Sequence, residues 1–504
     1  MSHLLLKSVR RFPQDDQQST ELLINSGKVE GWYRSGQAPR EDVDCEIDLE
    51  DRWLAPTFVD SHLHLLYTEQ HAQQISVAGM GVAECLAALS NFDRTGDSVV
   101  GHGWRDPLPK EMLPNPRRCL DKLFPDKSVL LWNADFHRVL VNSKIMNALG
   151  KVEDHDGVLV EEEAEAAWNL VKTNPFDEVP GACRRLLNCG ISAATTFDRG
   201  ESISAFRDNS PGRYGVIVRH GMAEEEFLES LDDGGAIPLG NRDDDFAIRW
   251  VKIFVDGTLG SRTAWLKQDY DDDPGNRGVV RRCGDSLAET AQAAGERGWG
   301  LALHAIGDAA VQEAIRAINV ARSARPKNVI ASDRIEHLQL LDPADMSSLI
   351  QSKAYASLQP CHLYEDRNIV RQRWGDRAAH AIPYRELLDS GVPVITGTDA
   401  PIEPLDPWAD IQAACQRRSR NGSGHIEGPH QRVGFLESFH AKTRDAAEAN
   451  CLPLDYGSLN SGSRADFQIL EKPPEEISNI SDAGLVQVYT DGNWRLSGEG
   501  AILS

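Results

Sequence analysis

The stretch Ala55-Pro-Thr-Phe-Val-Asp-Ser-His62-Leu-His64 is an apolar run that ends in a His-Leu-His triplet. In a β-strand, residues i and i+2 point to the same face, so His62 and His64 can approach one ion from adjacent positions. Imidazole nitrogens bind zinc and neighbouring transition metals. Because surface histidines also reach this spacing by chance, the triplet predicts a metal site only if further ligands occur elsewhere in the chain.

Strand-like and helix-like segments alternate through the middle of the chain. About eight apolar runs have strand character, and helical stretches such as 286–295 and 309–318 separate them. This alternation predicts an α/β fold of the (β/α)8 TIM-barrel type, in which working side chains sit at the carboxyl ends of the strands. The predicted strands lie around Phe58 and at 191–197, 214–218, 248–255, 300–304, 334–337, 355–359 and 392–399.

Both ends of the chain differ from the middle, because they contain short strands and turns. We predict that residues 1–55 and 452–504 pair into one small composite β-sandwich beside the barrel domain, which spans 56–451. Residues 65–190 connect the first two barrel strands, and this segment has many more residues than an ordinary connection. They predict an inserted subdomain that follows the carboxyl end of a strand and acts as a lid over the active-site mouth.

The composition predicts a soluble, cytoplasmic protein. The 504 residues carry a formal net charge of −24 and a pI near 5.1, which argues against nucleic acid and anionic membranes as partners. Nine cysteines without zinc-finger or CxxC spacing indicate reduced thiols rather than a disulfide framework. No apolar run reaches the length of a membrane span, and the first residues lack a small-residue cleavage site.

The segment Trp250-Val-Lys252-Ile-Phe254-Val-Asp256 places a lysine inside the predicted barrel. Strand alternation turns Lys252, Phe254 and Asp256 toward the barrel axis and the intervening aliphatic side chains toward the covering helices. A buried ammonium close to metal ions is costly, so we expect Lys252 to be neutral or modified. Carbamylation by carbon dioxide would make it an anion able to bridge two metals. A salt bridge between Lys252 and Asp256 is the competing interpretation.

Three further candidate ligands stand at the ends of predicted strands. His304 closes 300–304, His337 closes 334–337 and Asp399 closes the last strand. Taken singly, each histidine could be a satisfied structural residue, and Asp399 could be the N-cap of the next helix. Together with the triplet and the inward lysine, they place six candidate ligands at the carboxyl ends of barrel strands. The joint pattern predicts a two-metal hydrolytic site.

These motifs resemble the amidohydrolase superfamily, and within it the YtcJ-like branch. The likeness runs from end to end of the chain, but the passage 152–159 is shorter than the Gly-rich passage usual in that branch, which alters part of the expected pocket wall. The matching stretches are 59–64, 251–264, 303–311, 334–339, 357–360 and 397–403 in the barrel, Gly101-His-Gly-Trp104, Asp135-Phe-His137 and Asn142-Ser143 in the insert, and 462–466 near the end.

The resemblance implies a binuclear centre of two divalent ions, with zinc as the default metal. One ion would be held by the histidine triplet and Asp399, the other by His304 and His337, and carbamylated Lys252 would bridge them. Asp399 would take a proton from the metal-bridging hydroxide and deliver it to the departing nitrogen. The residues expected to contact substrate are Trp104 and His137 from the insert, Arg262 from the loop after the fourth strand, and His362.

The leading interpretation is a hydrolase that cleaves the carbon-nitrogen bond of a small-molecule amide, such as an N-acyl or N-formyl amine. The same site acting on a cyclic amide, lactone or other ester is an alternative, and a mononuclear deaminase would not need Lys252. A third alternative is a non-catalytic barrel with a binding or assembly role. A homodimer is compatible with the resemblance. We do not interpret Cys361-His362 as a nucleophile pair, because neighbours in an extended chain point to opposite faces.

Overall fold

The computed structural model describes residues 3–13, 20–77, 80, 82–91, 97–104, 116–133, 138–151, 156–160, 162–232, 239–329, 331–418 and 428–495. The chain forms two compact units. The first comprises Met1–Leu66 and Val179–Ser504, and the second comprises Tyr67–Glu178. The predicted insert, 65–190, contains the whole of the second unit.

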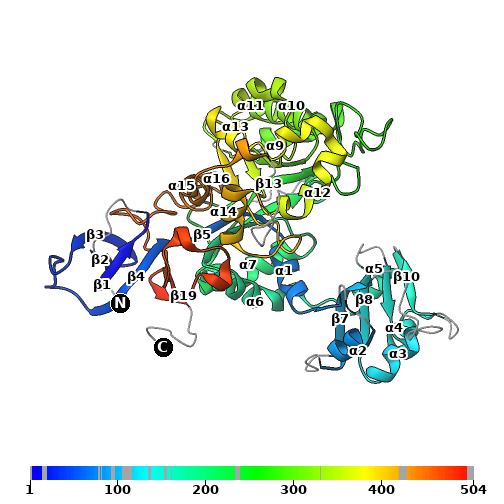
Figure 1. Cartoon of the computed structure of the whole chain (residues 1–504), viewed down its shortest axis with the longest axis horizontal. Helices are drawn as coiled ribbons and strands as arrows, with labels where there is room; N and C mark the ends of the chain where they lie inside the picture. The colour runs from blue at the N-terminus through cyan, green and yellow to red at the C-terminus, as the bar shows by residue number, and fades with distance from the viewer. Residues whose placement is uncertain are drawn as a thin grey trace. The chain divides into compact units, whose positions relative to one another are not determined.

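The first unit contains the predicted (β/α)8 barrel (Figure 1). Neighbouring strands are parallel and follow one another around the sheet in chain order. At its edges, the backbone N–H of Asp399 donates to the carbonyl of His62 (2.7 Å), so the last strand meets the first. The strands are β5 (Phe58–Leu63), β11 (Ile191–Thr196), β12 (Ile217–Ala223), β13 (Phe246–Phe254), β14 (Gly300–Ala305), β15 (Arg334–His337), β16 (Tyr355–Leu358) and β17 (Val394–Thr396).

Strand alternation in β13 decides which side chains enter the barrel. Val251 and Ile253 are buried in the main hydrophobic core under the helices, whereas Lys252 and Phe254 line an internal cavity. This arrangement confirms the alternation expected from the sequence. The helices of this unit are α6 (Pro175–Asn188), α7 (Ser202–Asn209), α8 (Glu224–Asp232), α9 (Gly284–Glu296), α10 (Asp308–Ala324), α11 (Met346–Ser352), α12 (His362–Trp374), α13 (Tyr384–Asp389), α14 (Pro407–Gln416), α15 (Phe435–His440) and α16 (Arg444–Ala449).

Strands from both ends of the chain share one seven-stranded mixed sheet. The long strand β4 (Cys45–Pro56) pairs in parallel with β1 and antiparallel with β18, so it joins the N-terminal and C-terminal strands. The described strands are hydrogen-bonded as a single sheet, in the order β20, β19, β18, β4, β1, β2, β3. The other members are β1 (His3–Arg11), β2 (Thr20–Asn25), β3 (Lys28–Arg34), β18 (Phe467–Leu470), β19 (Leu485–Thr490) and β20 (Asn493–Trp494).

The second unit has a five-stranded sheet and a core of its own. Its first helix, α1 (Leu65–Ala72), begins directly after the histidine triplet. None of the helices in the described parts of the chain is both long and apolar enough to cross a bilayer. The remaining elements of this unit are β6 (Ile75–Ser76), β7 (Ser98–Trp104), β8 (Ser128–Asn133), β9 (Arg138–Val141), β10 (Val158–Val160), α2 (Val82–Asn91), α3 (Pro116–Leu123), α4 (Ser143–Ala148) and α5 (Glu162–Asn169).

Candidate metal centre

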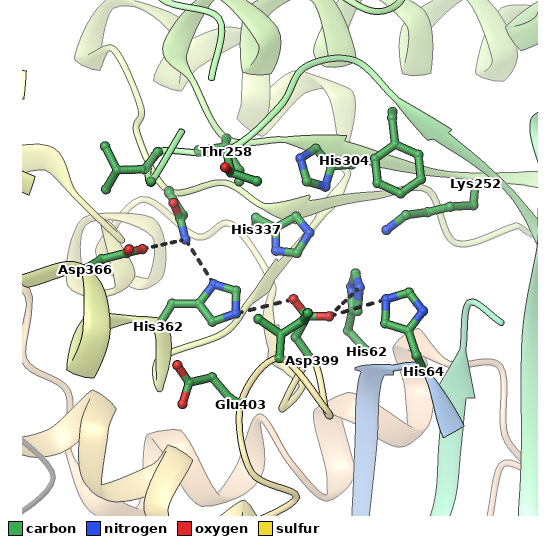
Figure 2. A pocket seen from close by; sticks show the side chains of 16 residues that line it. His62, His64, Lys252, Thr258, His304, His337, His362, Asp366, Asp399 and Glu403 are labelled. Carbon is green, nitrogen blue, oxygen red and sulfur yellow. Dashed lines mark hydrogen bonds and ion pairs between the residues drawn. The ribbon is translucent and has the colours of Figure 1, made fainter. Parts of the chain in front are cut away.

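A cavity of about 450 Å³ opens at the carboxyl ends of the barrel strands (Figure 2). All six predicted metal ligands line it, which brings together residues that are as far apart in the sequence as His62 and Asp399. The placement follows from the barrel itself, because parallel strands present their carboxyl ends on one side of the sheet. The lining residues are His62, His64, Lys252, Phe254, Thr258, Leu259, Gly260, His304, Ile306, His337, Gln339, His362, Asp366, Asp399, Ile402 and Glu403.

A buried carboxylate orients the ring of His62. Nδ1 of His62 lies 2.6 Å from Oε2 of Glu336, so its N–H donates to that carboxylate and Nε2 keeps its lone pair. Burial alone would raise the pKa of Glu336, but the guanidinium of Arg334 and the imidazole hold it well below its usual range. Burial also lowers the pKa of His62 to about 4. His62 is therefore a neutral ring whose free nitrogen faces the cavity.

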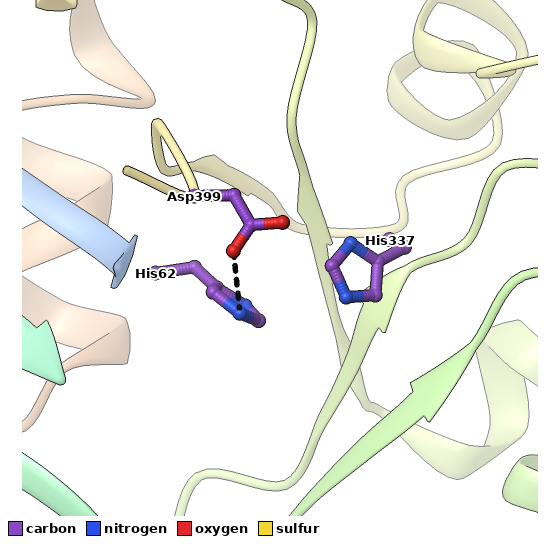
Figure 3. Close-up of side chains that lie close together, drawn as sticks. All are labelled: His62, His337 and Asp399. Atoms are coloured by element: carbon purple, nitrogen blue, oxygen red, sulfur yellow. Dashed lines mark ion pairs between the residues drawn. The ribbon is translucent and has the colours of Figure 1, made fainter. Parts of the chain in front are cut away.

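Three side chains come close enough together to hold one metal ion (Figure 3). One ligand atom from each of His62, His337 and Asp399 lies within 4.8 Å of the others, and all three residues are buried. Nδ1 of His337 has no hydrogen-bond partner among the described residues. Burial lowers the pKa of His337 well below its usual value, which keeps the ring neutral. A buried, unpaired imidazole nitrogen next to a carboxylate fits a divalent cation.

Two of these residues have a left-handed backbone conformation. His337 has φ of 74° and Asp399 has φ of 57°, in a region that non-glycine residues rarely occupy. His337 is the last residue of β15 and Asp399 lies three residues after β17, so in both places the chain turns at the end of a strand and redirects the side chain. This turn explains how Glu336 and His337, which are neighbours, both serve the same site although strand alternation alone would separate them.

The other three predicted ligands surround this trio. Nε2 of His64 lies 3.6 Å from Oδ1 of Asp399, close to the 3.5 Å that separates the same oxygen from Nε2 of His62. Nε2 of His304 lies 3.0 Å from the carbonyl of Gly257, which leaves Nδ1 as the nitrogen able to bind a metal. The ring centroids of His304 and His337 are 4.4 Å apart. One region of the cavity is thus flanked by two pairs of histidines, His62 with His64 and His304 with His337.

Lys252 is a buried lysine surrounded by rings. Its Nζ lies 4.2 Å from the ring centroid of Phe197 and 5.3 Å from that of Phe254. Burial lowers its pKa to about 8. The competing interpretation, a salt bridge to Asp256, is wrong: the Asp256 carboxylate instead accepts the backbone N–H groups of Trp265, Ile306 and Gly307 at 2.8–3.0 Å. No carboxylate of the described chain lies within 4.0 Å of the lysine nitrogen.

The four predicted substrate contacts have different outcomes. His362 lines the cavity and places Nε2 3.3 Å from Oδ2 of Asp399. Arg262 does not line the cavity. Its guanidinium instead donates two hydrogen bonds, of 3.2 and 2.7 Å, to the carboxylate of Asp272, and this pair holds the loop in place. Trp104 is buried in the core of the second unit, where its indole N–H donates to the carbonyl of Leu131. His137 lies outside the described residues.

Sequence reasoning missed four carboxylate or amide side chains of the site, Glu336, Gln339, Asp366 and Glu403. Glu336 had a usable signal, because Arg334 and Glu336 place two charges on the same face of a buried barrel strand. Gln339, Asp366 and Glu403 also line the cavity. They follow strands or stand in a helix, where no simple periodicity indicates which side chains turn toward the mouth.

A parallel barrel that carries histidines and an aspartate at the carboxyl ends of its strands is the architecture of a metal-dependent hydrolase. The chain belongs to the amidohydrolase family, whose model matches residues 46–494. It is therefore a hydrolase with a TIM-barrel core, as the resemblance to the YtcJ-like branch implied.

Known relatives support this assignment. The chain is 29% identical over 472 residues to the putative amidohydrolase YtcJ of Bacillus subtilis, and the alignment covers 86% of each sequence. It is 21% identical over 525 residues to the N-substituted formamide deformylase of Arthrobacter pascens, and this alignment covers 95% of each sequence. An uncharacterized metal-dependent hydrolase from Pyrococcus horikoshii has a similar structure, with a TM-score of 0.81 and 25% identity over 96% of this chain and 100% of that one.

Proposed function

We propose that this hydrolase cleaves the carbon-nitrogen bond of a small-molecule amide, such as an N-formyl or N-acyl amine. The observation that carries the proposal is the buried trio of His62, His337 and Asp399 beside an inward lysine. The name of the Arthrobacter relative, a deformylase of N-substituted formamides, supports the choice of an amide.

The donor set is suited to two divalent ions, with zinc as the first choice. The resemblance would assign His62, His64 and Asp399 to one ion and His304 and His337 to the other, and the structure also brings His337 within reach of an ion held by His62 and Asp399. When bound, the ions would supply Lewis acidity toward the substrate carbonyl and would lower the pKa of water in the site toward about 7.

Lys252 would join the two halves of this centre as a carbamate. Its neutral ε-amine would attack carbon dioxide, form an N–C bond, release one proton and leave a carboxylate-like anion with two oxygens. The pKa near 8 supports this step, since a larger fraction of the amine is neutral at physiological pH than in an exposed lysine. The amine lies beside the rings of Phe197 and Phe254, so no carboxylate at these positions pairs with its ammonium form.

Asp399 would move the proton. Its carboxylate would accept a proton from the attacking water and deliver it to the departing amine nitrogen as the tetrahedral intermediate collapses. Burial raises the pKa of Asp399, but His62 and the bond from His362 outweigh burial and hold the pKa well below its usual value. The carboxylate is thus ionised before substrate enters, which is the state that a proton acceptor requires.

The test is amine release by zinc-reconstituted protein from a panel of N-formyl, N-acetyl and longer or aromatic N-acyl amines. The matched background is Asp399→Asn, which retains the size of the side chain but cannot accept the proton. We expect release by the wild type and a loss of at least about 100-fold in kcat in the variant, with bound metal quantified in both. Amide turnover that does not depend on Asp399 contradicts the mechanism. If no amide of the panel is hydrolysed, cyclic amides, lactones and other esters become the preferred candidate substrates.

A further inference from the structure

Asp399 and His362 form a pair whose members come from different parts of the barrel (Figure 2). The backbone N–H of Asp399 donates to the carbonyl of His62 at 2.7 Å, which ties Asp399 to β5. His362 is the first residue of α12, which follows β16. The contact between the two side chains therefore depends on the groups that hold the start of α12 in place relative to β5.

This pair determines how the carboxylate of Asp399 is turned. Its Oδ2 lies 3.3 Å from Nε2 of His362, and its Oδ1 lies 3.5 Å from Nε2 of His62 and 3.6 Å from Nε2 of His64. A rotation of the carboxylate would carry Oδ1 away from the last two imidazole nitrogens. The contact with His362 opposes that rotation, because it holds Oδ2 beside the imidazole.

Lys442 joins the β5 side of this arrangement through its backbone. Its carbonyl accepts the N–H of Val59 in β5 at 2.7 Å, and the carbonyl of Ala441 accepts the N–H of Thr396 in β17 at 3.2 Å. The segment 441–442 therefore bonds to both strands of the junction that carries two of the proposed metal ligands.

The side chain of Lys442 reaches the start of α12 through Asp410. Its Nζ lies 2.7 Å from Oδ2 of Asp410, and the two side chains are 1% and 0% exposed. Oδ1 of Asp410 accepts the backbone N–H of Cys361 at 3.0 Å, and Cys361 directly precedes His362. Burial lowers the pKa of Lys442, but the carboxylates of Asp410 and Asp60 outweigh burial and hold the pKa above its usual value. The ammonium form is therefore kept at neutral pH, and the contact is an ion pair.

The contacts close a ring. From Asp399 the ring runs through β5 to Lys442, from Lys442 through Asp410 to the start of α12, and from His362 back to Asp399. We propose that Lys442 is a positioning residue, which acts through Asp410 to hold the imidazole of His362 against the carboxylate of Asp399. The inference rests on the proposed function, because that function makes Asp399 both a metal ligand and the proton carrier.

The test replaces the ion pair with a neutral pair, in the variant Lys442→Met/Asp410→Asn. The amide oxygen at position 410 can still accept the N–H of Cys361, and no buried charge is left unpaired, so we expect the protein to fold. Zinc affinity, measured by competition with a chelating dye, should fall by at least about fivefold, because a ligand that is no longer held in orientation binds metal less tightly. Lys442→Met alone, in which Asp410 can take up a proton, is the second variant and should show the same fall. Affinity equal to that of the wild type in both variants overturns the inference.

Arg325→Met/Asp333→Asn is the matched control. This buried ion pair has an N–O distance of 2.7 Å, and Asp333 accepts the N–H of Leu301 at 3.1 Å, just as Asp410 accepts that of Cys361. The control pair lies at the amino ends of β14 and β15, away from the cavity. Its zinc affinity should stay within about twofold of the wild type. An equal fall in the control would show that the loss of any buried ion pair loosens the centre, which overturns a specific role for Lys442.

The same substitutions in a His362→Asn background separate positioning from packing. If Lys442 acts through His362, the imidazole is already absent, and removal of the ion pair should change zinc affinity by less than about twofold. If the ion pair acts through packing alone, the fall should be as large as in the wild-type background. That second result overturns the positioning role.

Turnover distinguishes this inference from the proposed function. The affinity measurements need no substrate, so they decide the role of Lys442 even if no amide is hydrolysed and the proposed reaction fails. If amides are hydrolysed, kcat should also fall by at least about tenfold in Lys442→Met/Asp410→Asn, because the proton carrier is no longer held in orientation. Hydrolysis with the zinc affinity and kcat of the wild type would establish the reaction and overturn the inference.

Discussion

At the residue scale, the contact between His62 and Glu336 decides which imidazole nitrogen faces the cavity. The bond of 2.6 Å holds the proton on Nδ1 and leaves Nε2 available as a ligand. Glu336 is itself held by Arg334 through a contact of 2.5 Å inside the barrel. Such partners tune metal affinity without touching the metal.

Replacing Glu336 with glutamine should weaken metal binding. The amide oxygen can still accept the N–H of His62, but it lacks the charge that strengthens the bond and raises the basicity of the ring. We expect zinc affinity to fall by roughly 10- to 100-fold. Competition with a chelating dye measures this affinity, and Glu475→Gln controls for the lost charge. An affinity equal to that of the wild type contradicts the orienting role.

A second prediction at this scale concerns Lys252. Lys252→Ala removes the proposed bridging anion, so metal content and activity should be lost together. A short carboxylic acid added to the buffer should restore part of both, because its carboxylate can occupy the position of the carbamate. Metal analysis and turnover with and without the acid check this. A variant that is fully active without any additive excludes the bridging role.

The sequence was most informative for residues whose position in a strand determines their direction. The histidines, Lys252 and Asp399 could be located because barrel strands expose functional groups at their carboxyl ends. Glu336 was missed because the left-handed conformation of His337 interrupts the strand alternation. Arg262 pairs with Asp272 and does not line the cavity, because a loop side chain follows its local partner rather than a periodicity; its contact with substrate stays a prediction.

At the element scale, the segment that follows β17 packs very closely against β5. A Cβ added at Gly397 would lie 2.3 Å from the backbone nitrogen of His62, which no real contact allows. The same junction holds Asp399 through its bond to the carbonyl of His62. A glycine here lets the last strand pack against the first and sets the position of two of the proposed metal ligands, His62 and Asp399.

Gly397→Ala should therefore disturb both stability and the site. Overpacking of a rigid backbone contact costs about 1–3 kcal/mol, and displacement of Asp399 should reduce activity further. Thermal unfolding and zinc content measure the two effects. Gly260→Ala is the stability control, because an added Cβ there meets nothing within 4 Å. Equal melting temperatures for the two variants would show that β17 and β5 can separate at little cost.

At the scale of the whole molecule, the seven-stranded sheet joins the two ends of the chain. Turns and short strands at both ends indicated that they pair, but the sequence could not specify that β4 lies between β1 and β18. Partner choice between distant strands depends on packing and register, which local patterns do not encode. The lid role expected for the insert stays a prediction.

The sheet should contribute to the stability of the first unit independently of the metal centre. Phe467 on β18 is buried, and its ring stacks on Tyr489 with centroids 5.0 Å apart. Phe467→Ala should lower the free energy of unfolding by about 3–5 kcal/mol. Leu454→Ala is the control, since this side chain is 90% exposed and should change little. Denaturant unfolding measures both variants, and a Phe467→Ala protein as stable as the control contradicts this contribution.

The position of β4 between the two chain ends also has a consequence for biosynthesis. The side chain of Gln468 donates to the carbonyl of Pro56 although 412 positions separate them. A ribosome that adds about 5–20 residues per second needs roughly 20–80 s to produce this partner. During that time the edge of β4 that later binds β18 presents unpaired backbone groups, which in other proteins promote aggregation. The nascent chain therefore has a long interval in which a chaperone that binds extended segments would raise the yield of native protein.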